Sequence, residues 1–190
     1  MRRVIYFVTT NEGKLREARI VLGNYGFYVE AVNTRKLELQ SESLEEVVSF
    51  AAAQLIGKVV DPFIVEDSGL FIQSLNGFPG PYSSYVYKTL GVKGVLKLLE
   101  DIEDRKAKFV SVTALCFQGE IRTFRGEVEG TISFEARGST GFGFDPIFIP
   151  AGYDLTFAEM TLKLKCEISH RAKSLSVLAN YLLEITGSSK

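Results

Sequence analysis

The chain opens with an uninterrupted apolar run, continues through a polar turn and then takes on a helical pattern. Residues 4–8, VIYFV, are all β-branched or aromatic, which is typical of a strand buried on both faces. The polar stretch TTNEGK follows at residues 9–14. From Lys14 onward apolar positions recur at helical spacing up to Gly26, a residue type that commonly ends helices. The pattern predicts a strand, a polar turn and a helix.

A second helix and a second strand follow the first unit. Ser43 and Glu46 form a capping box, and the apolar residues behind them lie on one helical face as far as Leu55. The next apolar run, FIVEDSGLFI at residues 63–72, predicts a strand that is interrupted by the polar residues 66–68.

The remaining pattern is richer in strands. Residues 76–85, NGFPGPYSSY, predict a loop, because glycine and proline punctuate them. We expect a helix over 92–102, two strands over 108–117 and 121–134, an irregular segment over 139–150 and a last helix from Ser169. Helices alternate with strands in the first hundred residues and a strand-rich stretch follows. This order favours a mixed α/β fold.

Composition narrows the possible functions. A chain of 190 residues is long enough for one domain, 1–190, with a sizeable hydrophobic core. Its 22 basic and 23 acidic residues give a net charge of −1, so we expect no nucleic-acid partner of the kind that a strongly basic protein attracts. The apolar run at residues 4–8 is too short for a membrane span or a signal-peptide core.

The two cysteines point to a location. Cys116 and Cys166 lie far apart and lack the CxxC spacing of a zinc or redox site. We interpret both as reduced thiols of a cytoplasmic protein that binds no membrane.

The turn TTNEGK carries the first candidate chemistry. A strand delivers Thr9, Thr10, Asn11 and Lys14 to the start of a helix, where free backbone N–H groups and the helix dipole favour an anion. The spacing is not that of a Walker A loop. A structural alternative has Asn11 as the helix N-cap and Lys14 in solvent. This stretch alone is compatible with both interpretations.

The stretch VEDSGL places two carboxylates in an apolar strand. Glu66 and Asp67 would be tolerated in a packed core only if they were paired or bound to a metal. Successive strand residues point to opposite faces, so we expect both to reach one site only if the strand ends there. An oxygen-ligand site for Mg²⁺, completed by substrate phosphates, would explain them. A strand end that turns into solvent at Ser68 is the alternative.

Two further stretches lie near the C-terminus. In GFGFDP, the rings of Phe142 and Phe144 either pack in the core or stack on a planar base, and Asp145 could accept hydrogen bonds from that base. In ISHRAK, Ser169 as N-cap puts His170, the only histidine, and Arg171 in the first helical turn, where the dipole disfavours cations. We therefore expect an acceptor-rich ligand at this helix start, with a structural histidine as the alternative.

Taken in order, the stretches TTNEGK, VEDSGL, FGFDP and SHR resemble the inosine triphosphate pyrophosphatase family, which removes aberrant purine nucleotides. The similarity covers essentially the whole chain and includes FPG at 78–80 and TFAEM at 156–160. The resemblance implies Mg²⁺-dependent hydrolysis of ITP, dITP and XTP to the monophosphate and pyrophosphate. It also implies a homodimer and an elongated α/β fold, with a mixed sheet flanked by helices and two lobes around an active-site cleft.

The resemblance also assigns residues. The phosphates would be held by Thr9, Thr10, Asn11, Glu12, Gly13 and Lys14. Glu38 and Asp67 would bind the metal, and Asp67 would be the general base for the attacking water, with Ser68 beside the substrate. The base would be held by Phe142, Gly143, Phe144 and Asp145, and the pocket would be completed by Lys165, His170 and Arg171.

Two features of this chain qualify the family pattern. Many members carry a phosphate-contacting lysine sixteen residues before the Asp67 position, where this chain has Ala51, so we expect Lys14 or Lys58 to serve instead. Phe144 stands where some relatives have tryptophan, and either ring can stack.

Selectivity would follow from hydrogen bonding. Hypoxanthine and xanthine present a 6-oxo acceptor where adenine presents an amino donor, so donors from His170 or Arg171 would favour the former. Two other functions stay open on sequence grounds: a phosphatase or phosphotransferase that uses the same turn, and a purine nucleotide sensor without catalysis.

Overall fold

The computed structural model describes residues 3–37 and 39–187, and its centre is a mixed seven-stranded sheet. The strand order is β2-β1-β3-β5-β6-β7, with β4 paired to β3. The strands are β1 (Arg3–Val8), β2 (Phe27–Val32), β3 (Phe63–Ile72), β4 (Pro79–Gly80), β5 (Lys106–Phe117), β6 (Glu120–Ile132) and β7 (Phe148–Pro150). β1 runs parallel to β2 and β3, and the remaining pairs are antiparallel.

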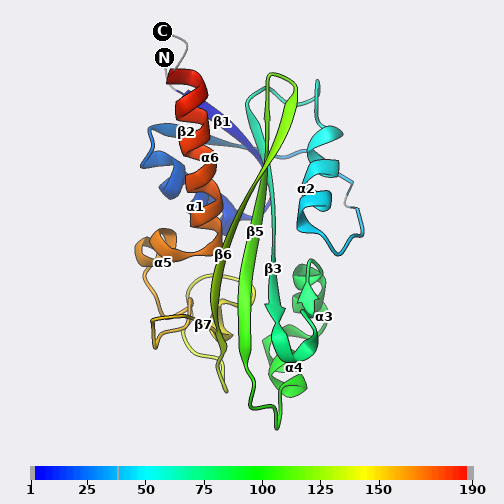
Figure 1. Cartoon of the computed structure of the whole chain (residues 1–190), viewed down its shortest axis with the longest axis vertical. Coiled ribbons are helices and arrows are strands. Elements are labelled where there is room, and N and C mark those ends of the chain that lie inside the picture. The colour runs from blue at the N-terminus through cyan, green and yellow to red at the C-terminus, as the bar shows by residue number, and fades with distance from the viewer. Residues whose placement is uncertain (1–2, 38, 188–190) are drawn as a thin grey trace.

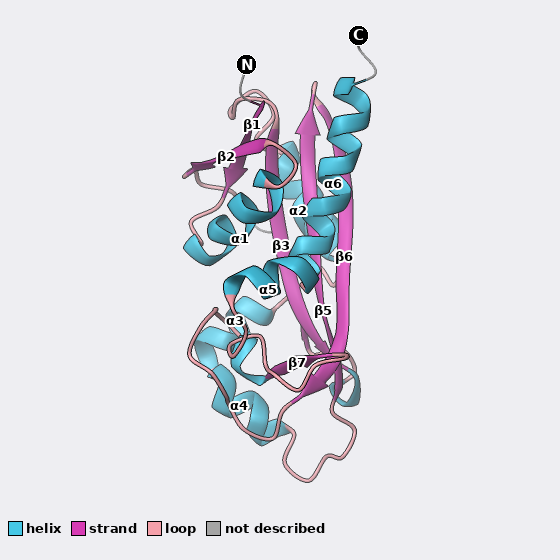
Figure 2. Ribbon diagram, turned by 90° about the vertical axis from the view of Figure 1, so that its left-hand side faces the viewer, coloured by secondary structure: helices cyan, strands magenta, loops and turns pink. Residues whose placement is uncertain are grey.

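Helices cover both faces of this elongated sheet (Figures 1 and 2). The elements α1 (Glu12–Gly23), α5 (Leu162–Ile168) and α6 (His170–Gly187) lie on one face, and α2 (Leu44–Ala53) lies on the other. The short helices α3 (Ser83–Thr89) and α4 (Gly91–Leu98) lie at the lower end of the molecule (Figure 1). None of the helices in the described ranges combines the length and apolar character that a bilayer span requires.

The hydrophobic core is divided along the long axis. One cluster packs α1 and α6 against the upper part of β1 and β2, and a second packs α2 against β3 and β5. A third cluster fills the lower part, where Phe109, Phe148 and Phe157 meet side chains of α3 and α4. The site described below lies where the first and third clusters adjoin. The mixed α/β fold predicted from the sequence is confirmed.

Several element boundaries differ from the sequence prediction. The strand expected to be interrupted at residues 66–68 is continuous, because β3 pairs with β5 without a break from Phe63 to Ile72. The sequence analysis did not assign β2 or α5, and α3 begins inside the predicted loop at 76–85. The helix expected over 92–102 is α4, which ends earlier, at Leu98.

A glycine on β6 allows the last helix to approach the sheet closely. A Cβ atom at Gly126 would lie 2.2 Å from the carbonyl oxygen of His170 and 2.3 Å from the backbone nitrogen of Ser174. Both atoms belong to the first turns of α6, so the helix backbone rests directly on the strand backbone. This contact fixes the position of Arg171, which is next to His170 and central to the site.

We predict that Gly126→Ala lowers the free energy of unfolding by about 2–3 kcal/mol, because the methyl group meets backbone atoms that cannot rotate away. Urea denaturation measures the change. Gly23→Ala at the end of α1 is the matched control, since nothing lies within 4 Å of a Cβ built there. The control is expected to change stability by less than about 1 kcal/mol. Equal stability of Gly126→Ala and the parent protein would contradict the close docking of α6.

Candidate functional site

Charged side chains from distant parts of the sequence form one continuous line from the edge of β3 to the helices α1, α6 and α5. Signs alternate along this line, which we call the charge chain. Its members, in spatial order, are Asp67, Lys14, Glu66, Arg171, Glu17, Lys165 and Asp145. Five of the seven are buried, so their charges depend on their neighbours in place of water, whereas Lys14 and Asp67 are partly exposed.

Arg171 occupies the centre of the charge chain and is only 1 % exposed. Its guanidinium donates to Glu17 Oε2 at 2.6 Å, to Glu66 Oε1 at 3.2 Å and to the Ser68 hydroxyl at 2.9 Å. Burial alone would lower the pKa of Arg171, but the two carboxylates raise it above its ordinary value. The cation at the start of α6 is therefore stabilised by the protein itself. Its charge is compensated without a ligand, and an acceptor-rich ligand at this helix start stays a prediction.

Glu66 and Asp67 both reach Lys14 because β3 has an open edge. β1 pairs with β3 only at Phe63 and Ile64, so the strand is not covered by β1 beyond that point. Lys14 Nζ lies beside this edge, 2.9 Å from Glu66 Oε2, 3.5 Å from Asp67 Oδ1 and 3.3 Å from the Glu66 carbonyl oxygen. The sequence analysis required the strand to end for both carboxylates to share a site. That requirement is wrong, since an uncovered edge achieves the same result.

The two neighbouring carboxylates have opposite pKa shifts. Burial raises the pKa of Glu66, but Arg171 and Lys14 outweigh it and hold the pKa well below its ordinary value. Burial raises the pKa of Asp67, and Lys14 offsets only part of this. The Asp67 side chain is also 28 % exposed, whereas that of Glu66 is fully buried. Asp67 is therefore the more basic and more accessible carboxylate, as a proton acceptor should be.

At the other end of the charge chain, Asp145 holds a glycine-rich loop. Its Oδ2 accepts from the backbone N–H of Phe142 at 2.8 Å and from Lys165 Nζ at 2.6 Å. Lys165 also lies 2.7 Å from Glu17 Oε1. A Cβ atom on Gly141, which has φ +75°, would lie 2.1 Å from Asp145 Oδ2, so only glycine fits there. The geometry thus fixes the loop against α5.

The Phe142 ring connects this loop to the turn at the start of α1. A Cβ atom on Gly13 would lie 2.4 Å from the ring, so the two are in direct contact. The ring centroid is 4.8 Å from Lys165 Nζ and 5.4 Å from Arg171 Cζ, within the range of a cation–π contact. The candidate base-binding loop and the candidate phosphate-binding turn therefore meet in one place.

His170 and Phe144 face the lower core. The His170 imidazole stacks on Phe109 with centroids 4.6 Å apart, and the residue is 3 % exposed. Burial and then the charge of Arg171 lower the pKa of His170 well below its ordinary value, so the ring is neutral at pH 7. Its Nδ1 is buried with no hydrogen-bond partner among the described residues. Phe144 makes an edge-to-face contact with Tyr87 of α3 at 5.5 Å.

The turn at residues 9–14 has the predicted helix cap. The Asn11 side chain accepts from Lys14 N at 3.0 Å, and Thr9 Oγ1 accepts from Asn11 N at 3.1 Å. Thr10, Asn11 and Glu12 are exposed, so the start of α1 is open to solvent. The N-cap alternative for Asn11 is confirmed, whereas Lys14 is engaged with carboxylates and does not extend into solvent.

Most of the predicted site residues that the structure describes come together here. Glu38 lies outside the described residues. Lys58 is exposed in the turn after α2, and Ala51 is 1 % exposed and faces the core. Gly143 takes the left-handed conformation, φ +63°, within the loop that carries Phe142.

The sequence analysis missed Glu17. This carboxylate is 3 % exposed and bridges Lys165 and Arg171, the two buried cations of the charge chain. The sequence contained a signal for this residue, because Glu17 lies four residues before the apolar Val21 and therefore on the helix face that packs inward. A carboxylate on such a face requires a partner.

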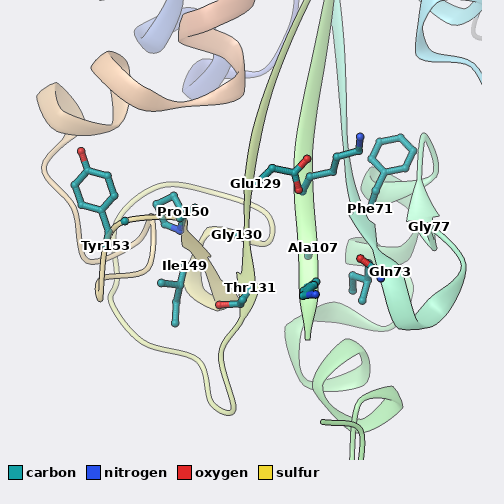
Figure 3. A pocket seen from close by; sticks show the side chains of 15 residues that line it. Phe71, Gln73, Gly77, Ala107, Glu129, Gly130, Thr131, Ile149, Pro150 and Tyr153 are labelled. Atoms are coloured by element: carbon teal, nitrogen blue, oxygen red, sulfur yellow. The ribbon is translucent and has the colours of Figure 1, made fainter. Parts of the chain in front are cut away.

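The charge chain does not line the large hollow on the lower part of the sheet (Figure 3). That hollow has a volume of about 690 Å³ and is bounded by side chains of β5, β6 and β7 and by the segment that follows β7. Among the residues that Figure 3 labels are Glu129, Ile149 and Tyr153. None of the seven residues of the charge chain lines this hollow. We place the candidate site at the charge chain because the predicted site residues gather there.

The lowered pKa of Glu66 gives a pH prediction. Its pKa in the folded protein is below the ordinary value of 4.5, so the unfolded state binds the extra proton when the pH falls below about that value. The stability from this group is complete above that pH and is lost as acid is added. We expect Glu66→Gln to be less stable than the parent protein at pH 7. Between pH 4 and 3, its free energy of unfolding should fall by about 1.4 kcal/mol less per pH unit than that of the parent. Urea denaturation across pH 3–7 measures both.

The control for this experiment is Glu30→Gln, because Glu30 is exposed on β2. Its profile should follow that of the parent protein. A Glu66→Gln profile that runs parallel to the parent at every pH would contradict the assignment of the low pKa.

Comparison with known proteins identifies the family. Residues 5–181 match the model of the Ham1 family. The chain is 51 % identical over 178 residues to a dITP/XTP pyrophosphatase of Pyrococcus horikoshii, covering 94 % of this chain and 96 % of the relative. It is 52 % identical over 178 residues to a dITP/XTP pyrophosphatase of Methanopyrus kandleri, covering 93 % and 95 %.

Solved structures agree with this assignment. A HAM1 protein from Coxiella burnetii superimposes with a TM-score of 0.83 at 30 % identity, covering 96 % of this chain and 99 % of that one. The Staphylococcus aureus Ham1 protein gives a TM-score of 0.81 at 29 % identity, covering 95 % and 98 %. These matches confirm the resemblance drawn from the four sequence motifs. The chain belongs to the Ham1 family.

Proposed function

We propose that the protein hydrolyses dITP, XTP and ITP to the nucleoside monophosphate and pyrophosphate. Relatives about half identical to the chain are named dITP/XTP pyrophosphatases. The observation that carries the proposal is the charge chain, which joins an anion-favouring turn to a loop of aromatic residues. A purine nucleoside triphosphate has the same two ends, a polyanion and a planar base.

The phosphates would bind at the turn of residues 9–14. The first N–H groups of α1 have no partner within the helix, and the positive end of its dipole favours an anion. The side chains of Thr9, Thr10 and Asn11 add donors, and Lys14 adds a charge. Glu12 and Gly13 complete the turn, and the Gly13 backbone lies close to the Phe142 ring.

Asp67 is the proposed general base. It would accept a proton from the water that attacks the α-phosphorus, and pyrophosphate would leave. Its raised pKa and its partial exposure at the open edge of β3 suit this role. Ser68 lies beside it in sequence, but its hydroxyl accepts from Arg171 and so connects the base to the centre of the charge chain.

Mg²⁺ is the proposed cofactor, held by Asp67 together with Glu38. No group of three or more potential ligands occurs among the described residues, yet Mg²⁺ is usually bound by one or two carboxylates and completed by phosphates and water. The carboxylates of Glu66 and Asp67 have a cationic group, Lys14, between them, so the local charge fits a cation. When bound, the ion would neutralise charge on the phosphates.

The base would bind beside the Phe142 ring, where the loop of Phe142, Gly143, Phe144 and Asp145 contacts Lys165 and Arg171 and lies near His170. An ammonium has three N–H donors, and Lys165 uses two of them on Glu17 and Asp145. We propose that the third donates to a 6-oxo oxygen of the base beside the Phe142 ring. Adenine presents an amino group at that position and would leave the donors unpaired, which disfavours it strongly.

We extend the proposal to a homodimer in the cytoplasm that binds no nucleic acid. Aromatic and aliphatic side chains are exposed around α3, including Tyr85 and Leu90 at 69 % and 49 %. Cys116 and Cys166 are both free thiols and buried, which fits the proposed location in the reducing cytoplasm. The net charge of −1 provides no general attraction for a polyanion such as nucleic acid. Sedimentation equilibrium at micromolar concentration tests the dimer.

Product analysis tests the reaction. The protein is incubated with Mg²⁺ and, separately, dITP, XTP, ITP, GTP and ATP, and the phosphorylated products are resolved. We expect monophosphate and pyrophosphate from the first three substrates and little turnover of ATP. Diphosphate and orthophosphate would indicate the alternative phosphatase function, and binding without turnover would indicate a sensor.

We predict that Asp67→Asn lowers kcat for dITP by about 10²–10⁴-fold, because the amide cannot accept the proton of the attacking water. Steady-state kinetics at saturating Mg²⁺ measures the loss. Asp61→Asn is the control, since Asp61 lies before the start of β3 and its Oδ2 accepts from the backbone N–H of Gly119 at 3.3 Å, away from the charge chain. Full turnover by Asp67→Asn would refute its assignment as the base.

Selectivity for the base is expected to depend on the donors near Asp145. We predict that Lys165→Met lowers the ratio of kcat/KM for dITP over dATP by about tenfold or more, because it removes the free N–H. His170→Phe keeps the stacking on Phe109 and removes only the ring nitrogens, so it separates a donor role from a packing role. If both variants keep the parental ratio, the proposed recognition of the base is incorrect.

A further inference from the structure

Lys14 is engaged in a way that conflicts with simple phosphate binding. Its ammonium is within 3.5 Å of both Glu66 and Asp67 and donates to the Glu66 carbonyl oxygen. Burial would lower the pKa of Lys14, but the two carboxylates raise it, so the side chain stays charged. An ammonium held in this way cannot extend fully to a triphosphate at the turn of residues 9–14.

The departure of Lys14 would leave a buried charge without compensation. Glu66 Oε1 is well supplied, since it accepts from Ser111 and from Arg171. Glu66 Oε2 is fully buried and receives no hydrogen bond of regular geometry from the described residues. The charge of Lys14, 2.9 Å away, is what stabilises that oxygen. Removal of this charge with nothing in its place would be costly.

The other cation beside Glu66 is not free to move. Arg171 is 1 % exposed and held by Glu17, Glu66 and Ser68 at once. Lys14 is different, because its side chain is 15 % exposed and lies at the open edge of β3. Its ammonium is also carried by a flexible chain of four carbons. Of the two cations that contact Glu66, Lys14 is the one that can leave.

We propose that Lys14 is the resident counter-ion of Glu66 and Asp67 in the metal-free protein, and that a divalent cation beside Asp67 displaces it toward the phosphates. The ammonium and the metal ion thus compete for the negative charge of Asp67 and of its neighbour Glu66. Once the divalent cation has neutralised them, Lys14 is free to contact the substrate. This inference rests on the proposed metal dependence.

The exchange couples two binding events. A divalent cation releases Lys14 and so improves the phosphate site, and by linkage a bound triphosphate that holds Lys14 improves the metal site by the same factor. The protein would therefore bind the nucleotide and the metal together in preference to either one alone. The test uses Mg²⁺ or Mn²⁺ without nucleotide, so its outcome does not depend on which triphosphate is hydrolysed.

The first experiment measures metal affinity in the absence of nucleotide. Mn²⁺ is titrated into the full-length protein and free Mn²⁺ is followed by electron paramagnetic resonance. We expect Lys14→Met to bind Mn²⁺ about tenfold more tightly than the parent, because the competing ammonium is gone. Lys14→Arg keeps a competing cation, and Lys58→Met removes an exposed charge in the turn after α2. Both should bind within about threefold of the parent. Unchanged or weaker binding by a folded Lys14→Met would overturn the proposal.

The second experiment follows the displacement in the unaltered protein and decides the question even if Lys14→Met fails to fold. Amine-reactive labelling is quantified by mass spectrometry with and without Mg²⁺. We expect Mg²⁺ to increase labelling of Lys14 about fivefold or more relative to exposed Lys58. Buried Lys165, whose partners are Glu17 and Asp145, should show no change. Protection of Lys14 by Mg²⁺, or no change, would overturn the proposal.

Discussion

The ion pairs of Arg171 with Glu17 and Glu66 are the interaction on which the rest of the site depends. They join α1, β3 and α6, elements that are more than a hundred residues apart at the extremes, in a position that water scarcely reaches. Loss of one partner from such a buried pair leaves an uncompensated charge, at a cost of about 3–5 kcal/mol. Gly126 contributes by letting α6 rest on β6, which brings Arg171 within reach of both carboxylates.

The alternation of charges explains how the site can be prepared before a ligand binds. The cations beside Glu66 hold its pKa low, so it stays ionised, while the more exposed Asp67 has a raised pKa. Two adjacent residues on one strand thereby acquire different roles, one in structure and one proposed in proton transfer. At the far end, Lys165 and Asp145 fix the loop that carries Phe142 by the same means. Apart from Lys14, which we propose moves toward the phosphates, fixed charges of this kind need little rearrangement when substrate charge arrives.

Local sequence signals predicted the features that depend on local physics. The buried first strand, the Asn11 cap and the mixed α/β fold follow from apolar runs and helix-start chemistry. Features set by contacts across the sheet were not predictable in this way. The continuity of β3 through Glu66 depends on cations from α1 and α6, and the role of Glu17 depends on a lysine and an arginine more than 140 residues away. β2 was missed because its pattern, FYVEAV, has only two fully buried positions.

In the proposed complex, one purine nucleotide spans the charge chain from the turn at residues 9–14 to the loop at residues 142–145. A crystal structure with Mg²⁺ and a dITP analogue that cannot be cleaved between the α- and β-phosphates tests this most directly. We expect phosphates at the start of α1 and a base stacked at Phe142, with its 6-oxo oxygen near Lys165. A base bound elsewhere, for example in the hollow of Figure 3, or phosphates away from α1 would contradict it.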